Sequence, residues 1–341
     1  MSVTQQKYTI IKSLGKGEYG LVYEVQNPDG GRFALKQYFP EDEGIPLGAL
    51  REISVLKQLQ KLNPYPQNLI KLHDIITTSD SIAIVIPLYH TTLTSAIQTN
   101  MISLEQKNHI CLGVLTGLMW LMTCEILHRD IKPDNIMLDD EMNPVIIDFS
   151  IANNRTNTEH VCSFAYRPPE IFDKQPYTFS LDMWSFGIMM LEMYTKKFIR
   201  FNTRTEIMDY ILYAKDKTIE GSYFFLVKDI LVQDPTVRFT PFQCISLLRP
   251  QYTFSCIPKS MFKGEEKVSE QIKSICEDYN ISDQQTKLAA QIYLSTMDST
   301  YSQLVVILAA KFYEKEPLEI SGNFYKEELE VFRKRNYNLF I

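Results

Sequence analysis

Alternating apolar and polar residues mark the beginning of the chain. The pattern runs through "YTIIKSLGKGEYGLVYEV" (8–25) and resumes in "RFALKQY" (32–38). Alternation of this kind is typical of strands with one buried face. Between the two stretches lie Pro28, Asp29, Gly30 and Gly31, which are turn-forming residues. We therefore predict antiparallel strands joined by a turn at 28–31.

A helical spacing of apolar residues follows in "PLGALREISVLKQLQKL" (46–62). The residues that share one side of this helix are Leu50, Ile53, Leu56, Leu59 and Leu62. Glu52 lies one turn before Leu56, so its carboxylate borders the buried face. A half-buried carboxylate needs a cation, and Lys36 in the preceding strand is available. The alternative for Lys36 is an ordinary solvent-exposed strand lysine.

The pattern also predicts two further buried strands and a helical C-terminal segment. "SIAIVIP" (81–87) reads as a buried strand, and "VII" (145–147) reads as the end of another. Residues 251–267 have a loop-like composition, and the apolar spacing in 268–341 predicts several helices. The chain is therefore predicted to end in a helical segment behind a linker of about 17 residues.

Composition narrows the class of protein. The 341 residues are 45% hydrophobic and carry a net charge of −6, which is typical of a globular protein and argues against a general nucleic-acid binder. The N-terminus has no signal pattern, and the longest apolar runs, such as 304–310, are too short to span a bilayer. The six cysteines form no CxxC pair, so we expect a reduced intracellular protein without disulfides or a zinc site.

The first alternating stretch (8–25) contains three closely spaced glycines. Gly15, Gly17 and Gly20 have the spacing GxGxxG, which lets backbone N–H groups approach phosphate oxygens. A flexible hairpin is the alternative. The dinucleotide-binding version of this motif needs a following helix, whereas a strand follows here, so that version is disfavoured.

The segment "EILHRDIKPDNIMLDDEMNPVIIDFS" (125–150) carries the strongest motif. Asp148 ends an apolar strand, where a carboxylate is costly unless it is paired or holds a metal. His128, Arg129 and Asp130 precede Lys132 and Asn135 in the same segment. Together with the glycine motif ending at Val22, this order resembles the eukaryotic protein kinases, with their HRDxKxxN loop and DFG motif.

The resemblance implies a role for each residue in phosphoryl transfer from ATP. Asp130 is the expected base for the substrate hydroxyl, with Lys132 beside the transferred phosphate. Lys36, aligned by Glu52, is expected to hold the α- and β-phosphates. Asn135 and Asp148 are the expected Mg²⁺ ligands. Ser150 replaces the glycine of the DFG motif. We therefore expect the site to keep its metal binding, and the segment that begins at Asp148 to flip out of the site less readily.

The same resemblance assigns supporting residues. The expected ATP-binding set comprises Gly15, Gly17, Gly20, Val22, Ala34, Lys36, Ile86, Pro87 and Tyr89. His128 is expected to pack against the backbone of the metal motif, and Asp182 to brace the catalytic loop. Glu170 is expected to pair with Arg238.

Two segments resemble the cyclin-dependent kinases in particular. "PLGALRE" (46–52) is similar to their PSTAIRE helix, with Leu50 in the place of the residue that docks into a cyclin. "TEHVCSFAYRPPE" (158–170) aligns with the end of their activation segment. This implies phosphorylation at Thr158, a proline-selecting role for Arg167 and an inhibitory site at Tyr19. The arginines expected to clamp the phosphate are Arg51, Arg129 and Arg155.

The C-terminal segment resembles the first helical repeat of a cyclin box. The similarity runs through "TKLAAQIYLSTMDSTYSQLVVILAAKFYEKEP" (286–317) and "EELEVFRKRNYNL" (327–339). Lys311 and Glu328 match the pair with which cyclins contact the kinase. A small helical tail packed on the kinase is the alternative.

These expectations define one overall prediction. The fold is α+β: a bilobal kinase domain (1–250) with a β-rich lobe (1–87) and a helical lobe (88–250), a linker (251–267) and an all-α cyclin-like segment (268–341). The predicted function is a Ser/Thr protein kinase of the cyclin-dependent type, using ATP and Mg²⁺ in the cytoplasm or nucleus. Expected partners are protein substrates and a cyclin or the chain's own tail, with no nucleic acid or membrane. A catalytically weak kinase-like scaffold is the alternative, and a small-molecule kinase is disfavoured by Lys132 and by "SFAYRPPE".

Overall fold

The structure is a computed structural model. It describes residues 7–17, 20–40, 44–78, 81–153, 161–200, 202–215 and 217–249. Within these ranges the chain forms two compact units, one comprising 7–62 and 71–88 and the other 63–70 and 89–249. Among the helices in the described ranges, none is both long and apolar enough to cross a membrane.

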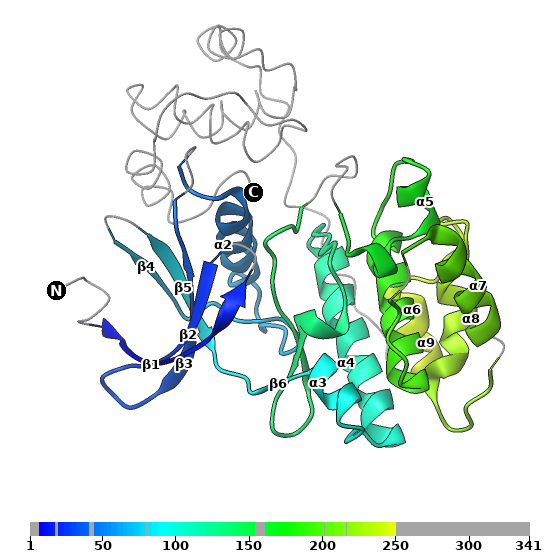
Figure 1. Cartoon of the computed structure of the whole chain (residues 1–341), viewed down its shortest axis with the longest axis horizontal. Helices are drawn as coiled ribbons and strands as arrows, with labels where there is room; N and C mark the ends of the chain where they lie inside the picture. Colours follow the sequence, from blue (N-terminus) through cyan, green and yellow to red (C-terminus); the bar gives the residue numbers. More distant parts are fainter. Residues whose placement is uncertain are drawn as a thin grey trace, which may run out of the picture. The chain divides into compact units, whose positions relative to one another are not determined.

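The first unit is a five-stranded antiparallel sheet with one long helix beside it (Figure 1). The strand order is β1 (Thr9–Gly17), β2 (Gly20–Gln26), β3 (Arg32–Tyr38), β5 (Ile82–Pro87) and β4 (Asp74–Thr77). The predicted turn lies between β2 and β3. It is closed by Asn27, whose side-chain oxygen accepts a hydrogen bond from the Gly31 N–H at 2.6 Å, and Gly30 supplies a left-handed backbone at φ 87°.

The helix of this unit, α2 (Leu47–Leu59), buries the predicted apolar face. Leu50, Ile53, Leu56 and Leu59 are each fully buried. The prediction that the helix continues to Leu62 was wrong, because α2 ends at Leu59. Pro64 disfavours a helical backbone at the residue before it, so the chain leaves the helix within the "QKLN" that follows Leu59.

The second unit is mainly helical. Its helices are α3 (Leu93–Gln98), α4 (Leu104–Thr123), α5 (Pro169–Phe172), α6 (Ser180–Thr195), α7 (Arg204–Lys215), α8 (Val227–Ile230) and α9 (Pro241–Leu248). Three short 3₁₀ turns, Pro133–Asn135, Phe164–Tyr166 and Tyr223–Leu226, lie between them. A small antiparallel sheet joins β6 (Thr91–Thr92), β7 (Ile136–Leu138) and β8 (Pro144–Ile146).

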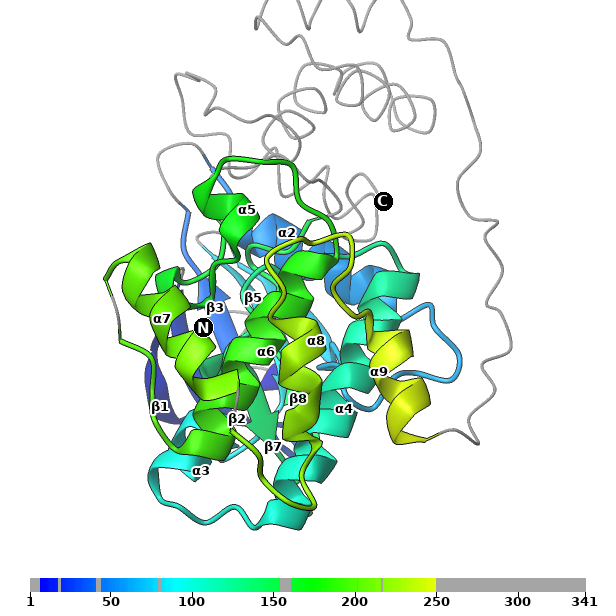
Figure 2. The same ribbon diagram turned by 90° about the vertical axis from the view of Figure 1, so that its right-hand side faces the viewer.

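The core of the second unit is α6. Its residues from Leu181 to Tyr194 are all buried, and the helix packs against α4 and α8 (Figure 2). Most of these residues are apolar, and a helix with apolar residues on all its sides is stable in water only when neighbouring elements surround it. The same unit carries Asp130 and Lys132, which precede β7, and Asp148, which follows β8.

The predicted order of an N-terminal antiparallel sheet followed by a helical lobe is confirmed. The predicted linker (251–267) and cyclin-like segment (268–341) lie outside the described residues.

Candidate active site

One face of the five-stranded sheet gathers predicted nucleotide-binding residues. In the strand register, Val22 is opposite Lys36, and Ala34 is opposite Ile86. Directly opposed residues, and residues two apart on one strand, point to the same face of a sheet. The three apolar side chains therefore share a face with the Lys36 ammonium group.

The glycine turn joins β1 and β2 at the end of this sheet. Gly17 pairs with Gly20, and Gly15 pairs with Val22. A Cβ added at Gly20 would lie 1.8 Å from the Gln37 carbonyl oxygen, so only glycine fits there. A Cβ at Gly15 would meet no described atom within 4 Å. The turn therefore combines one sterically required glycine with one that leaves the backbone accessible, as a phosphate-binding turn requires.

The predicted ion pair between β3 and α2 is present. Lys36 Nζ lies 2.7 Å from Glu52 Oε2, and the two residues are 9% and 2% exposed. Losing one member of such a buried pair costs about 3–5 kcal/mol, because the other charge is left uncompensated. The pair therefore fixes the position of the Lys36 ammonium group relative to the sheet.

In the second unit, Asp130 is the centre of a hydrogen-bonded cluster. Its Oδ2 contacts Lys132 Nζ at 2.7 Å and accepts a hydrogen bond from Asn135 Nδ2 at 2.8 Å. Its Oδ1 accepts hydrogen bonds from the Ser163 hydroxyl at 2.9 Å and from the Ser163 N–H at 3.2 Å. Both carboxylate oxygens are thus held in a defined orientation, as a positioned general base requires.

Ser163 is a site residue that the sequence reasoning did not identify. It lies 33 residues after Asp130, and its hydroxyl oxygen also accepts a hydrogen bond from Lys132 Nζ at 2.9 Å. The hydroxyl therefore connects the end of the activation segment to the catalytic loop. The available signal was its place immediately before "FAYRPPE", but a single serine in a loop has no pattern of its own.

Asn135 and Asp148 provide oxygen donors suited to a divalent cation. The Asn135 amide nitrogen donates to the Asp130 backbone and side-chain oxygens, both at 2.8 Å, so the amide oxygen is the atom left for a cation. Asp148 is half-buried with φ 64°, and its Oδ1 accepts a hydrogen bond from the Ser150 N–H at 3.2 Å. No group of three or more His, Cys, Asp or Glu residues that could hold a metal occurs in the described ranges. One carboxylate and one amide fit Mg²⁺, which usually takes its other ligands from phosphates and water.

Asp182 braces the catalytic loop and His128 contacts the backbone beside the metal motif, as predicted. The Asp182 carboxylate accepts hydrogen bonds from the backbone N–H groups of His128 and Arg129, each at 2.8 Å. The His128 Nε2 donates to the Ile147 carbonyl at 2.9 Å, because its Nδ1 accepts from the Asp130 N–H. Burial raises the pKa of Asp182 above its usual value, and the hydrogen bonds oppose that rise.

The backbone carbonyl of Cys162 accepts a hydrogen bond from a nearby arginine side chain. Cys162 has a left-handed backbone at φ 59°, and its carbonyl accepts a hydrogen bond from Arg167 Nε at 3.0 Å. A non-glycine residue with positive φ is uncommon and carries strain, which the surrounding contacts must hold in place. This carbonyl is therefore held toward the Arg167 guanidinium.

Tyr166 anchors the same segment to α6. Its hydroxyl donates to Glu192 Oε2 at 2.6 Å, and the other Glu192 oxygen accepts from the Ile199 N–H at 2.8 Å. Burial raises the pKa of Glu192 to about 7, although both hydrogen bonds favour the ionised form. The carboxylate thus serves as an internal acceptor that fixes the loop on the central helix.

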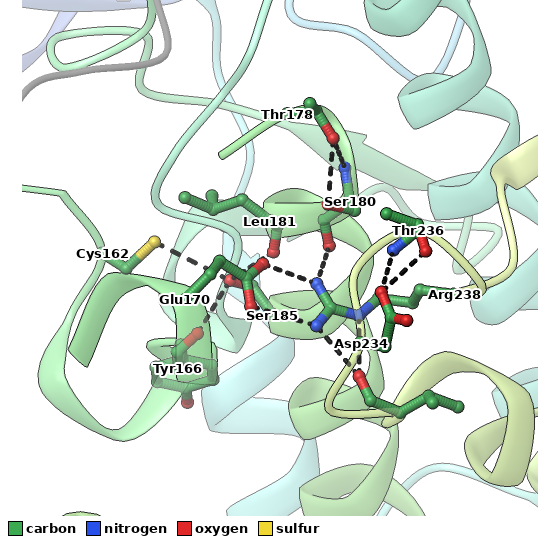
Figure 3. Close-up of polar contacts among 11 residues, drawn as sticks. Cys162, Tyr166, Glu170, Thr178, Ser180, Leu181, Ser185, Asp234, Thr236 and Arg238 are labelled. Atoms are coloured by element: carbon green, nitrogen blue, oxygen red, sulfur yellow. Dashed lines mark hydrogen bonds and ion pairs between the residues drawn. The ribbon is translucent and has the colours of Figure 1, made fainter. Parts of the chain in front are cut away.

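The predicted pair between Glu170 and Arg238 is present and bidentate (Figure 3). Arg238 Nη1 and Nη2 donate to the two Glu170 carboxylate oxygens at 2.8 and 3.2 Å. The guanidinium also donates to the Ser180 and Val232 carbonyls and lies 5.0 Å from the centre of the Trp184 ring. This buried cluster closes the activation segment onto the α6 helix and the loop before α9.

Some of the remaining predicted residues lie inside the described ranges and some lie outside them. Inside these ranges, Arg51, Pro87 and Tyr89 are half-buried, and Leu50 and Arg129 are buried. Arg129 donates a hydrogen bond from Nε to the Ile151 carbonyl at 2.5 Å. The predicted regulatory and tail residues lie outside the described ranges: Tyr19, Arg155, Thr158, Lys311 and Glu328.

Comparisons with known proteins agree with this geometry. The family model described as "Protein kinase domain" matches residues 8–248. The chain is 29% identical over 229 residues to the "Probable CTD kinase subunit alpha homolog" of Encephalitozoon cuniculi (strain GB-M1), covering 65% of this chain and 68% of that protein. It is 31% identical over 220 residues to the "Cyclin-dependent kinase 4 homolog" of Caenorhabditis elegans, covering 59% and 53%. It is 33% identical over 196 residues to "Cyclin-dependent kinase 14" of Xenopus tropicalis, covering 54% and 45%, so the chain spans about half the length of these last two relatives.

Proposed function

Because the chain belongs to the protein kinase domain family and has cyclin-dependent kinase relatives, we propose that it transfers the γ-phosphate of ATP to serine or threonine hydroxyls of proteins. The observation that carries this proposal is the Asp130 carboxylate, which Lys132, Asn135 and Ser163 hold in one orientation. Such a carboxylate can accept the proton of an incoming hydroxyl as the oxygen attacks the phosphorus.

The other site residues bind and align the nucleotide in this proposal. Lys36 contacts the α- and β-phosphates, and Lys132 lies beside the phosphate in transit. Asn135 and Asp148 hold Mg²⁺, which neutralises phosphate charge when bound. The apolar residues on the Lys36 face of the sheet contact adenine, together with the backbone of Pro87 and Tyr89.

A kinase-like scaffold without activity is the competing function. A scaffold has no need of an aligned carboxylate or of a buried lysine paired with a glutamate, both of which are costly to bury. The ordered Asp130 cluster and the Lys36–Glu52 pair therefore favour an enzyme.

We propose that the substrate residue after the phosphorylated hydroxyl is proline. A residue with a backbone N–H would need an acceptor there, but the Cys162 carbonyl is taken by Arg167. Proline has no N–H to satisfy, so it docks without that cost. An unsatisfied N–H costs about 1–3 kcal/mol, which corresponds to roughly 5- to 150-fold discrimination.

Substituting Arg167 tests this preference. In Arg167→Ala the Cys162 carbonyl loses its donor, so we expect the ratio of kcat/KM for a Ser-Pro peptide over a Ser-Ala peptide to fall about tenfold. Phosphopeptide formation by the full chain measures the ratio. Arg204→Ala is the matched control, since Arg204 pairs with Asp173 on the same unit and should leave the ratio unchanged. A ratio equal in wild type and Arg167→Ala contradicts the proposal.

We further propose that activity depends on phosphorylation of Thr158 and on a cyclin or the chain's own residues 268–341. Arg51, Arg129 and Arg155 are the proposed phosphate ligands, Tyr19 is a proposed inhibitory site, and Leu50, Lys311 and Glu328 are proposed contacts between kinase and cyclin-like partner. The sequence resemblance supports this regulation, as does the similarity to cyclin-dependent kinases. The domain boundaries at 250 and 268 belong to the same proposal.

Removing the tail tests the intramolecular version. We expect deletion of 262–341 to lower kcat about 5- to 150-fold, the range of a typical coupling free energy, and the separate tail peptide to restore it. Nucleotide affinity of the truncated chain serves as the control for folding. Unchanged kcat after deletion would exclude an activating role for the tail.

A further inference from the structure

A buried tyrosine completes the Lys36–Glu52 ion pair. Tyr38, the last residue of β3, is 0% exposed, and its hydroxyl donates a hydrogen bond to Glu52 Oε2. The same oxygen lies 2.7 Å from Lys36 Nζ. Two side chains of one strand thus converge on a single carboxylate oxygen of α2.

The strand geometry explains why both side chains reach Glu52. Lys36 and Tyr38 are two residues apart, so they project from the same face of the sheet. The Lys36 Nζ lies 5.4 Å from the centre of the Tyr38 ring, close enough for a favourable cation–π contact. The tyrosine therefore contacts both charged groups of the pair, one through its ring and one through its hydroxyl.

Glycine at position 20 accommodates this arrangement. Gly20 is directly opposite Tyr38 in the β2–β3 register, and a Cβ there would lie 3.3 Å from the Tyr38 Cα in addition to its clash with the Gln37 carbonyl. The end of β3 that carries Tyr38 is thus packed closely against the strand that leaves the glycine turn.

The hydroxyl offsets part of the cost of burying the pair. A buried carboxylate with an unsatisfied lone pair is destabilising, and a hydrogen bond to a charged group contributes more than one between neutral groups. At the start of α2 the N-cap residue is Pro46, which makes no side-chain cap hydrogen bond, so the helix N-terminus is not fixed by a capping side chain. Side-chain contacts to β3 are therefore an important restraint on the position of the first turns of α2.

We propose that Tyr38 is a positioning residue for phosphoryl transfer, which acts by holding Glu52 against Lys36. The inference rests on the proposed kinase function, because it gives the Lys36 ammonium a role in binding phosphates. Without the Tyr38 hydroxyl, the Glu52 carboxylate has one restraint fewer. Because Glu52 positions the Lys36 ammonium, the ammonium then spends less time in the position that binds the phosphates productively.

The test compares Tyr38→Phe with Tyr8→Phe in the full chain. Tyr8 is also buried in the sheet unit and donates its hydroxyl to a carboxylate, Asp74 Oδ2, at 3.3 Å. Two quantities are measured: kcat/KM for ATP, and the ratio of the affinities for ATP and adenosine, which isolates phosphate binding. We expect both to fall about tenfold in Tyr38→Phe and by less than about twofold in Tyr8→Phe.

A double-mutant cycle with Glu52→Ala shows whether the effect passes through Glu52. If Tyr38 acts by positioning that carboxylate, Tyr38→Phe changes both quantities by less than about twofold in the Glu52→Ala background. Equal effects in the two backgrounds, or equal effects of Tyr38→Phe and Tyr8→Phe, overturn the inference. A wild-type chain that binds ATP but transfers no phosphate overturns the proposed function instead, and the affinity ratio still decides the role of Tyr38.

Discussion

Replacing Asp130 by asparagine is expected to lower kcat by about 10²- to 10⁴-fold, the usual contribution of a positioned general base. The amide can still accept hydrogen bonds from Asn135 or Ser163, so the loop keeps most of its shape. It cannot accept the proton of the substrate hydroxyl, and it no longer neutralises the Lys132 ammonium. We therefore expect affinity for Mg-ATP to stay within about twofold of wild type, so that the loss appears in kcat.

The Asp130→Asn experiment needs a carboxylate control and two readouts. Asp140→Asn removes an exposed carboxylate from the turn between β7 and β8 and should leave kcat unchanged. Steady-state phosphorylation of a Ser-Pro peptide gives kcat, and calorimetric titration with Mg-ATP gives affinity. Wild-type and Asp130→Asn chains with the same kcat would remove Asp130 from the mechanism.

The largest effect on stability is expected at Arg238. In Arg238→Met the buried Glu170 carboxylate and the Ser180 and Val232 carbonyls all lose their donor. The side chains of Arg238 and Glu170 are only 0% and 3% exposed, so water cannot replace the guanidinium. We expect the free energy of unfolding to fall by about 3–5 kcal/mol.

Urea titration followed by tryptophan fluorescence measures this loss, because both tryptophans, Trp120 and Trp184, lie in the helical unit. Arg204→Met provides the contrast. Arg204 forms a well-exposed pair with Asp173, whose loss should cost less than about 1 kcal/mol. The double variant Glu170→Met and Arg238→Met should recover part of the stability, since no buried charge is left alone. Equal losses in Arg238→Met and Arg204→Met would contradict the account.

The Lys36–Glu52 pair illustrates what the sequence could predict. A lysine in an apolar strand and a glutamate beside the buried face of the next helix each need a partner, so the sequence indicates that they pair with each other. The bracing by Asp182 and the Glu170–Arg238 pair came from family resemblance, and the described residues place both as expected. In each case the motif fixes both residues, so the contact follows once the fold is known.

Ser163 and Tyr38 show where sequence reasoning stops. Ser163 contacts Asp130 although 33 positions separate them in the sequence, and no periodicity encodes that contact. Tyr38 reads as one more apolar residue at the end of a strand, because its hydroxyl matters only when α2 brings Glu52 alongside. The end of α2 was also placed too late, because apolar spacing continues to Leu62 while the backbone has already left the helix. Tertiary contacts decide all three.

We propose that this chain transfers phosphate from ATP to protein hydroxyls by means of the Asp130 cluster. The most direct measurement is the number of phosphopeptide molecules formed per enzyme molecule from Mg-ATP and a Ser-Pro peptide. The enzyme is the full chain, purified from a eukaryotic host with any proteins that copurify with it. We expect many turnovers for wild type and a rate at least 100-fold lower for Asp130→Asn purified in the same way. Wild-type product no greater than that of Asp130→Asn, from a chain that binds Mg-ATP, would contradict it.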